Sequence, residues 1–228
     1  MPEPGIKRGR MHDAEGARAA ILDAAEKVFA EHGFDGARID AIATQAHYNK
    51  SLIFQYFGDK LALYDEVIRR ADDQTRVMQN EALGSLSKAE AALDSEHIRT
   101  LLGEYVGWYF DYLLEHPTIL RIYMWEMAEG WQTFSKIVSQ RDFDDVDQFA
   151  PVLEKLESAG LLRSNPNLFL QLSSALFFPA LFLSLLPMVK MYLPTFDPSS
   201  PAELAQAREF VIEFVLEGLL VTPAPAES

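Results

Sequence analysis

The chain has 228 residues, a length that suits one large domain or a small domain joined to a larger one, and its hydrophobic content of 49% excludes a disordered chain. Cysteine is absent, which excludes disulfides, thiolate metal sites and a cysteine nucleophile and fits a cytoplasmic location. The net charge is −14, yet the first 70 residues carry ten Lys and Arg against eleven Asp and Glu, so residues 71–228 account for −13 of it. A nucleic-acid surface is therefore expected only in the first third of the chain.

The first third of the chain has a helical pattern, because its apolar residues recur at helical spacing and no hairpin or alternating β pattern is present. Residues 1–14 are expected to form a basic flexible arm. Gly33 is a candidate cap at the end of the first helix, and Asp59 is placed to accept hydrogen bonds from the first turn of the fourth. The pattern predicts helices over about residues 15–32, 39–46, 50–57 and 60–80.

The remainder of the chain is also helical by pattern. Residues 84–95 are weakly patterned and are expected to be a loop or boundary. The sequence from Ser200 to Glu203 has the form of a capping box with proline at the first helical position. Five further helices are predicted, over about residues 96–115, 117–130, 144–159, from 165 onward, and 200–220. The fold class is therefore all-α, with a DNA-binding domain over 15–70, a regulatory and dimerisation domain over 71–222, and a disordered tail over 223–228.

The two short helices and the tight turn between them form a helix-turn-helix arrangement, braced by a longer helix on each side. Such a motif needs a second helix that presents polar side chains to the major groove while its apolar side is locked to the bracing helices. Leu52, Ile53 and Phe57 can lock the helix, and Lys60 is placed to meet a phosphate. Phe54 is compatible with either the core or the groove. Periodicity alone leaves a simple helical bundle as the alternative.

The segment from Ile21 to Ile68 closely resembles the DNA-binding domain of the tetracycline-repressor (TetR) family. The matching parts are AAEKVFAEHGF, IDAIATQA and NKSLIFQYFGDK, and the resemblance covers about a fifth of the chain. It implies a helix-turn-helix followed by a helical regulatory domain with a ligand cavity. Three positions depart from the family pattern: Arg38 replaces the usual Thr or Ser cap, His47 replaces glycine in the turn, and Leu61 replaces Glu.

The predicted DNA contacts lie in and around the helix-turn-helix. Lysine can bond phosphate or guanine, and glutamine suits adenine. His47 is expected to need a left-handed backbone in the turn. The candidate DNA-binding residues are Arg38, Thr44, His47, Tyr48, Asn49, Lys50, Ser51, Phe54, Gln55, Tyr56 and Lys60.

Residues 96–134 are rich in aromatic side chains, which occur at helical spacing on two successive predicted helices. Such stripes form the core of most helical proteins, but Tyr and His tips on an apolar surface also suit a pocket. Because the resemblance implies a ligand cavity here, we expect some of these residues to line it and the others to pack. The candidate pocket residues are Tyr105, Trp108, Tyr109, Tyr112, His116, Tyr123, Met127, Trp131 and Phe178.

The stretch 164–189 contains no charged residue, and its length and composition would pass for a membrane span. It also contains Pro179 and Pro187, and no cluster of Lys or Arg anchors either end, so we favour a helix buried between two subunits over a membrane helix. The candidate dimer interface is formed with the final helix by Leu172, Leu176, Ala180, Leu183, Leu204, Ala207, Val211, Phe214, Val215 and Gly218.

No catalytic, metal or cofactor site is expected. The acidic run from Asp142 to Asp147 fails the calcium-loop pattern, the five histidines lack ligand spacing, and no nucleophile elbow or phosphate-binding loop is present. The sequence therefore predicts a ligand-responsive regulator that binds a double-stranded palindromic DNA operator as a homodimer and is released by a small-molecule effector. The alternatives are a helical ligand carrier or enzyme with a vestigial DNA-binding domain, and a membrane-anchored regulator.

Overall fold

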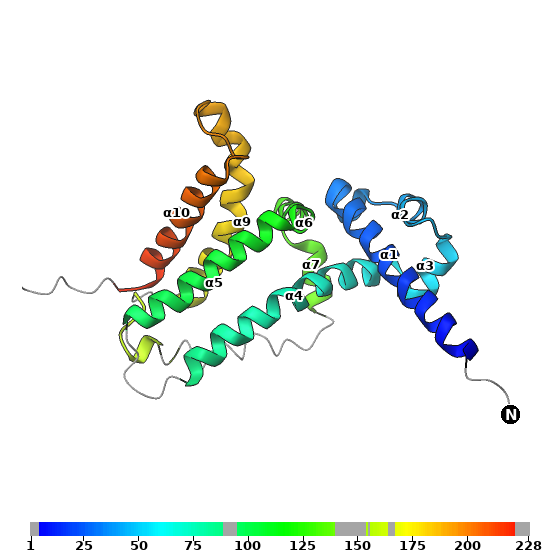
Figure 1. The fold of residues 1–228 in the computed structure, drawn as a ribbon, viewed down its shortest axis with the longest axis horizontal. Helices are drawn as coiled ribbons and strands as arrows, with labels where there is room; N and C mark the ends of the chain where they lie inside the picture. The colour runs from blue at the N-terminus through cyan, green and yellow to red at the C-terminus, as the bar shows by residue number, and fades with distance from the viewer. Residues whose placement is uncertain (1–4, 89–94, 140–153, 155, 164–166, 222–228) are drawn as a thin grey trace, which may run out of the picture. The chain divides into compact units, whose positions relative to one another are not determined.

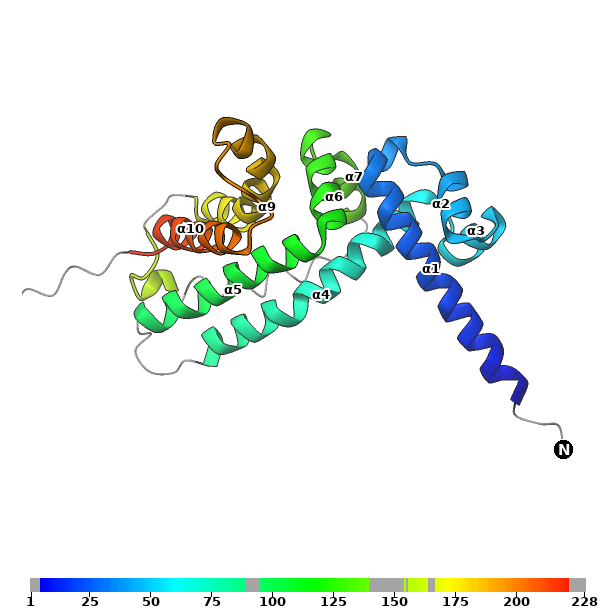
Figure 2. The same ribbon diagram turned by 45° about the horizontal axis from the view of Figure 1, so that its top comes forward.

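The computed structural model describes residues 5–88, 95–139, 154, 156–163 and 167–221 (Figures 1 and 2). Within these ranges the regular secondary structure is helical apart from one isolated β-bridge between Leu162 and Leu220, and short turns and loops join the helices. The all-α prediction is confirmed. The chain divides into two compact units. Unit 1 comprises residues 1–74 and 121–141, and unit 2 comprises residues 75–120 and 142–228.

Unit 1 contains the predicted helix-turn-helix. Its helices are α1 (Gly5–Gly36), α2 (Ile39–Ala46), α3 (Lys50–Phe57), the first part of α4 (Lys60–Lys88), the last part of α6 (Pro117–Ala128), and α7 (Gln132–Val138). Apolar residues from α1 to α4 fill the core, and Ile21, Phe29, Ile42, Ile53 and Leu63 are all at most 1% exposed. This core fixes the orientation of α3 against its bracing helices.

Gly33 interrupts α1 at the position where the sequence predicts a cap, with a φ of 66°. A Cβ at this position would lie 3.0 Å from the Trp125 side chain, so both the backbone conformation and the close approach favour glycine. The residues 5–14 that were expected in a flexible arm are the first turns of α1.

Unit 2 is built around α5 (Ser95–Glu115), α9 (Leu168–Tyr192) and α10 (Pro201–Leu219), each of which packs against the other two. Ile98, Phe110 and Leu113 of α5 are fully buried, as are Ala180 of α9 and Val211 of α10. These apolar contacts hold the three helices together as one core.

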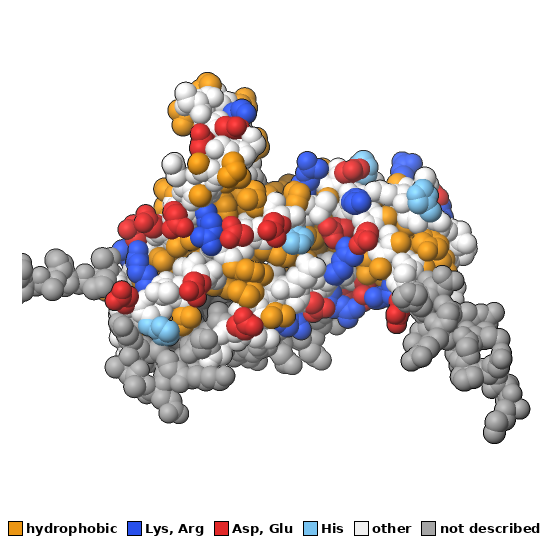
Figure 3. All heavy atoms as spheres, in the orientation of Figure 1, with side chains coloured by type: hydrophobic (Ala, Val, Ile, Leu, Met, Phe, Trp, Pro, Cys, Tyr) orange, Lys and Arg blue, Asp and Glu red, His pale blue; other side chains and the backbone are white. Residues whose placement is uncertain are grey.

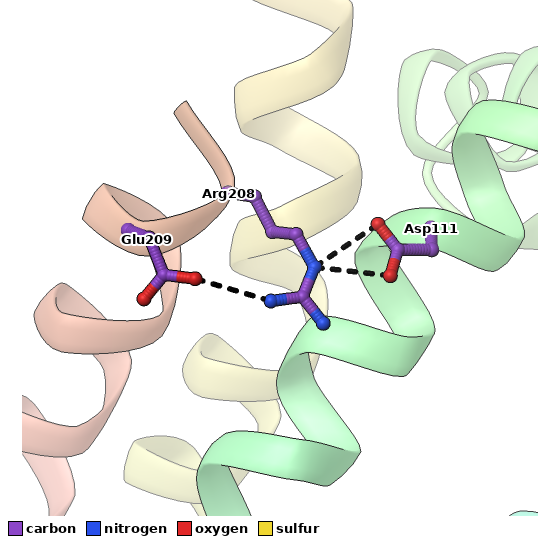
Figure 4. A network of polar contacts seen from close by, with 3 residues as sticks. All are labelled: Asp111, Arg208 and Glu209. Atoms are coloured by element: carbon purple, nitrogen blue, oxygen red, sulfur yellow. Dashed lines mark hydrogen bonds and ion pairs between the residues drawn. The ribbon is translucent and has the colours of Figure 1, made fainter. Parts of the chain in front are cut away.

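A polar network joins α5 to α10 at the edge of this core (Figure 4). Arg208 Nε donates to both carboxylate oxygens of Asp111, at 3.1 and 3.0 Å, and its Nη1 donates to Glu209 at 3.2 Å. The guanidinium lies over Gly107 of α5, where a Cβ would be 2.6 Å from Arg208 Cζ. Gly107 therefore makes room for the ion pair.

Several helix boundaries differ from the sequence prediction. α4 continues through Gly84 to Lys88, and α7 was not predicted at all. The cap of α9 is Asn167, which accepts from Leu170 N at 3.1 Å, rather than Asn165. Ser200 makes no side-chain cap, and the Glu203 carboxylate accepts from Asp197 N, so the capping box is not formed. Most of the predicted helix over 144–159 and the acidic run lie outside the described residues.

Candidate nucleic-acid interface

The turn between α2 and α3 has the geometry that the sequence predicts. His47 adopts a left-handed conformation (φ 59°, ψ 32°), and the amide of the next residue, Tyr48, donates to Ala43 O at 3.0 Å. Asn49 then caps α3, with its side-chain oxygen accepting from Leu52 N at 2.8 Å. Asp59 caps α4 in the same way through Ala62 N, also at 2.8 Å. The turn thus joins α2 to α3 in three residues, and the Asn49 cap sets where α3 begins.

The two sides of α3 differ in exposure. Ile53 and Phe57 are buried against the bracing helices, and Arg18 of α1 lies over the Phe57 ring at 5.2 Å. Leu52 and Tyr56 are half-buried. The exposed side is formed by Lys50, Ser51, Phe54 and Gln55. Phe54 is 46% exposed, which excludes it from the core.

The exposed Lys50 ammonium is held by a carboxylate of the neighbouring helix. Its Nζ lies 2.5 Å from Asp40 Oδ1, and both side chains remain well exposed. Asp40 lies in the first turn of α2, where Thr44 Oγ1 donates to its carbonyl oxygen at 2.9 Å. The charge of Lys50 is therefore balanced within the protein before any ligand arrives.

The remaining predicted contact residues surround this face. Arg38 is the N-cap residue of α2 but makes no side-chain cap, as its departure from the usual Thr or Ser implies. Thr44, His47, Tyr48 and Asn49 are all exposed. Lys60 at the start of α4 is half-buried, and its Nζ donates to Asp35 O at 3.2 Å and lies 4.6 Å from the Phe34 ring centroid. Burial lowers the pKa of Lys60 below its ordinary value, against the opposing effect of Asp35.

A buried carboxyl group, which sequence analysis missed, braces this motif from α6. Glu126 is 1% exposed, and both of its oxygens accept hydrogen bonds: Oε1 from Tyr64 Oη at 2.7 Å and Oε2 from Phe134 N at 3.1 Å. The Tyr64 ring packs edge-on against Phe29 in the core. Burial, followed by the hydrogen bond to Glu126, raises the pKa of Tyr64 far above its ordinary value.

A second polar contact joins α6 to α1. Trp125 Nε1 donates to Ala30 O at 3.1 Å, and the indole packs on Gly33. The same part of α6 lines a surface depression of about 400 Å³, formed by Ala30, Glu31, Arg121, Met124 and Trp125. None of the predicted pocket residues lines that depression.

Comparison with known proteins identifies the family. A family model described as "Bacterial regulatory proteins, tetR family" matches residues 21–67. The HTH-type transcriptional repressor NicS of Pseudomonas putida is 30% identical over 176 residues, which are 74% of this chain and 78% of the relative. The chain belongs to the TetR family.

Two further comparisons agree with this assignment. The HTH-type transcriptional repressor SCO4008 of Streptomyces coelicolor is 35% identical over 120 residues, which are 51% of this TetR-family chain and only 53% of that relative. The crystal structure of a TetR family transcription regulator from Marinobacter aquaeolei VT8 shares the fold, with a TM-score of 0.63 and 19% identity over 93% of this chain and 100% of that one.

The aromatic residues predicted to line a pocket in this TetR-family chain fall into separate groups. On α5, Tyr105, Trp108, Tyr112 and His116 form a ladder of ring contacts, with centroids 6.2, 5.5 and 4.2 Å apart in turn. Tyr112 is buried, and the other rings of the ladder, like Tyr109, are half-buried. Phe178 of α9 stacks on Phe214 of α10 at 4.3 Å. Tyr123, Met127 and Trp131 belong to unit 1.

The residues predicted for a dimer interface are placed on different sides of α9 and α10. Phe214 and Gly218 are exposed and Leu204 is half-buried, while the side chains of Leu172 and Leu176 lie outside the described residues. The other five are buried within the chain's own unit 2, so they are covered before any partner binds: Ala180, Leu183, Ala207, Val211 and Val215.

A set of apolar residues on α9 and α10 that shares only Phe214 with the predicted interface is exposed, and we call it the α9–α10 face. It comprises Phe177, Leu181, Leu185 and Met188 of α9, which recur at helical spacing, and Phe210 and Phe214 of α10, each 37–54% exposed. Figure 3 shows hydrophobic side chains gathered along the projecting end of α9. Among the described residues, one segment, Ser173–Tyr192 of α9, is long and apolar enough to cross a membrane by length and composition, and 24% of it is buried within the chain.

Proposed function

We propose that this TetR-family chain is a ligand-responsive transcriptional repressor that binds a palindromic DNA operator through α3. The observation that carries the proposal is the exposed side of α3, which bears Lys50, Ser51 and Gln55 while Ile53 and Phe57 fix the helix from behind. Lysine and glutamine are side chains that read base edges or phosphates in the major groove. NicS and SCO4008 are both HTH-type transcriptional repressors, which supports repression as the direction of regulation.

The acting species is proposed to be a homodimer held by the α9–α10 face. Phe182 and Phe210 pack with centroids 5.5 Å apart and Phe178 stacks on Phe214, so the exposed sides of the two helices adjoin. Six large apolar side chains on one adjoining surface are typical of an interface, and a second copy would cover them. Two copies of α3 could then reach successive major grooves. Coverage by a second copy, rather than by a membrane, also explains the apolar composition of α9. The protein is therefore proposed to be cytoplasmic.

The effector is proposed to bind in unit 2 against the aromatic ladder of α5. Half-buried rings with Tyr hydroxyl and imidazole tips suit a flat or apolar molecule with a few polar groups. The helices α4 and α6 each contribute residues to both units, so they are continuous connections through which a bound effector can shift the population of DNA-binding conformations. A thermal-shift screen of chemically diverse small molecules identifies the effector as a compound that raises the Tm.

A mobility-shift experiment tests the DNA-binding proposal. The intact protein is expected to retard the DNA upstream of its own gene and to be released by the effector found in the screen. Lys50→Ala and Gln55→Ala are expected to weaken binding about tenfold or more each, while helix content stays unchanged. The matched control is Gln132→Ala on the exposed surface of α7, which should bind as the wild type does. Absence of specific binding with and without effector would overturn the proposal.

Sedimentation equilibrium tests the homodimer separately. Leu181→Glu and Phe210→Glu each place a charge on the α9–α10 face and are expected to give monomers. Gln132→Glu adds the same charge outside that face and should leave the dimer intact. A wild-type protein that sediments as a monomer at micromolar concentration would contradict the proposed assembly.

A further inference from the structure

The exposed side of α3 contains one side chain that cannot form a hydrogen bond. Phe54 lies one turn after Lys50 and Ser51 and beside Gln55, and 46% of it is exposed. Residues three and four apart share a helix face, so the ring lies beside Lys50 and Ser51, and Gln55 lies four residues after Ser51 at the edge of the same exposed surface. Ile53 and Phe57 already fill the core side of the helix, and both are buried.

Exposure alone does not assign a role to an aromatic residue, because single apolar side chains are common on protein surfaces. The position of Phe54 on the face proposed to enter the major groove limits its role to contacts that an apolar ring can make with DNA. A phenyl ring can neither donate to a phosphate nor read the hydrogen-bonding edge of a base. The one apolar group that the base pairs present in the major groove is the C5-methyl group of thymine.

We infer that Phe54 is a specificity-determining residue that contacts the C5-methyl group of a thymine in each half-site of the operator. The inference rests on the proposed function and adds to it the chemical identity of one operator position. Lys50, Ser51 and Gln55 supply the polar contacts around the ring, while Phe54 selects for thymine over the other three bases. Losing the contact removes one buried methyl group per half-site, which corresponds to about a fourfold loss of affinity for one and about fifteenfold for two.

Uracil substitution isolates this contact, because uracil pairs as thymine does and differs from it only by the missing methyl group. Operator duplexes are first selected from random-sequence DNA with the full-length wild-type protein. Each thymine of the selected duplex is then replaced by uracil, one symmetric pair at a time, and the Kd is measured. We expect one symmetric pair at which uracil weakens binding by about fifteenfold, with other positions changing by less than twofold.

Two variants then assign the effect to Phe54. Phe54→Ala is expected to bind the thymine and uracil duplexes equally at that position. Gln55→Ala, on the same face, is expected to bind more weakly overall but to keep the full preference for thymine. Circular dichroism checks that Phe54→Ala is folded. If the variant does not fold, the uracil scan with the wild-type protein still tests whether a thymine methyl group is contacted.

The outcomes separate this inference from the function on which it rests. Specific binding that is insensitive to uracil at every position overturns the role of Phe54 and leaves the DNA-binding proposal intact. Sensitivity that persists unchanged in a folded Phe54→Ala variant also overturns it. Failure to select any specific duplex overturns the proposed function and the inference together.

Discussion

Replacing Tyr64 with phenylalanine is expected to destabilise the protein through the buried carboxyl group of Glu126. The substitution keeps the ring and its packing on Phe29 but removes the hydroxyl that donates to Oε1 at 2.7 Å. Because Glu126 is 1% exposed, water cannot replace the lost donor, and Phe134 N remains as the other donor to the group. A hydrogen bond to a charged group at such a site contributes about 1.5–3 kcal/mol to the free energy of unfolding.

The expected loss translates into a measurable change in melting temperature. For a chain of this size, each kcal/mol lowers the Tm by about 2–4 °C, so Tyr64→Phe should melt roughly 3–12 °C below the wild type. Urea unfolding followed by tryptophan fluorescence gives the free energy directly. Glu126→Ala should cost more than Tyr64→Phe, because it leaves two donors unsatisfied and opens a cavity.

The matched control for this prediction is Tyr48→Phe. It removes the same hydroxyl group from a tyrosine that is 37% exposed, where water is available to any polar group that contacted the hydroxyl. Its free energy of unfolding should lie within about 0.5 kcal/mol of the wild type. If Tyr64→Phe is as mild as Tyr48→Phe, the reasoning that Glu126 depends on Tyr64 is refuted.

Three further measurements follow from the same structure. The pKa of Tyr64 is raised in the folded protein, so the contribution of its hydroxyl to the free energy of unfolding is complete below the unfolded pKa of about 10. Above that pH the wild type should lose about 1.4 kcal/mol of stability per pH unit relative to Tyr64→Phe, measured by urea unfolding. If the stabilities of the two proteins change in parallel up to about pH 11, this prediction is wrong. Asp40→Asn should free Lys50 to bind a phosphate, which would steepen the dependence of log Kd on log salt by about 0.9 per subunit. The double variant Asp40→Asn with Lys50→Gln should show no such steepening. His47→Gly should raise the free energy of unfolding by about 1 kcal/mol, since only glycine adopts the left-handed region without strain. His47→Ala should give no such increase, and calorimetry of the two variants and the wild type measures the difference.

The starts of α3 and α4 were predictable because a capping residue marks each of them. Asn49 and Asp59 are capping residues directly before α3 and α4, and the structure uses both side chains as caps. The left-handed conformation of His47 also follows from its place in a two-helix turn. Local chemistry thus sets where α3 and α4 begin, and the burial of Ile53 and Phe57 could be inferred from their spacing.

The errors arose where local signals compete or mislead. Gly84 suggested a boundary, but one glycine costs a helix only about 1 kcal/mol, and α4 continues through it. The turn before α7 depends on Trp131 in a left-handed conformation, which nothing in its residue type signals. The sequence Asn165–Pro166–Asn167 offers two possible caps, and only the structure shows that Asn167 is used.

The contact between Tyr64 and Glu126 could not be predicted, because the residues are 62 positions apart and belong to different helices. Glutamate is almost never fully buried without a partner, so a sequence rule places it on the surface. A related limit applies to α9 and α10, where five of the residues predicted for the dimer interface are buried within the chain's own unit 2. Helical spacing identifies an apolar stripe, but a helix that is apolar on several sides does not reveal which side faces its own domain and which faces outward.

The charge distribution indicates what kind of DNA recognition this acidic chain can support. At physiological salt the Debye length is about 8 Å, so only charges close to a phosphate contribute strongly to binding. On α3 the single cation, Lys50, is paired with Asp40, and its neighbours Ser51, Phe54 and Gln55 are neutral. Non-specific attraction by this face is therefore weak, because little charge is free to neutralise phosphates. Discrimination among sequences must then come from short-range contacts with base edges, to which the exposed phenyl ring of Phe54 contributes.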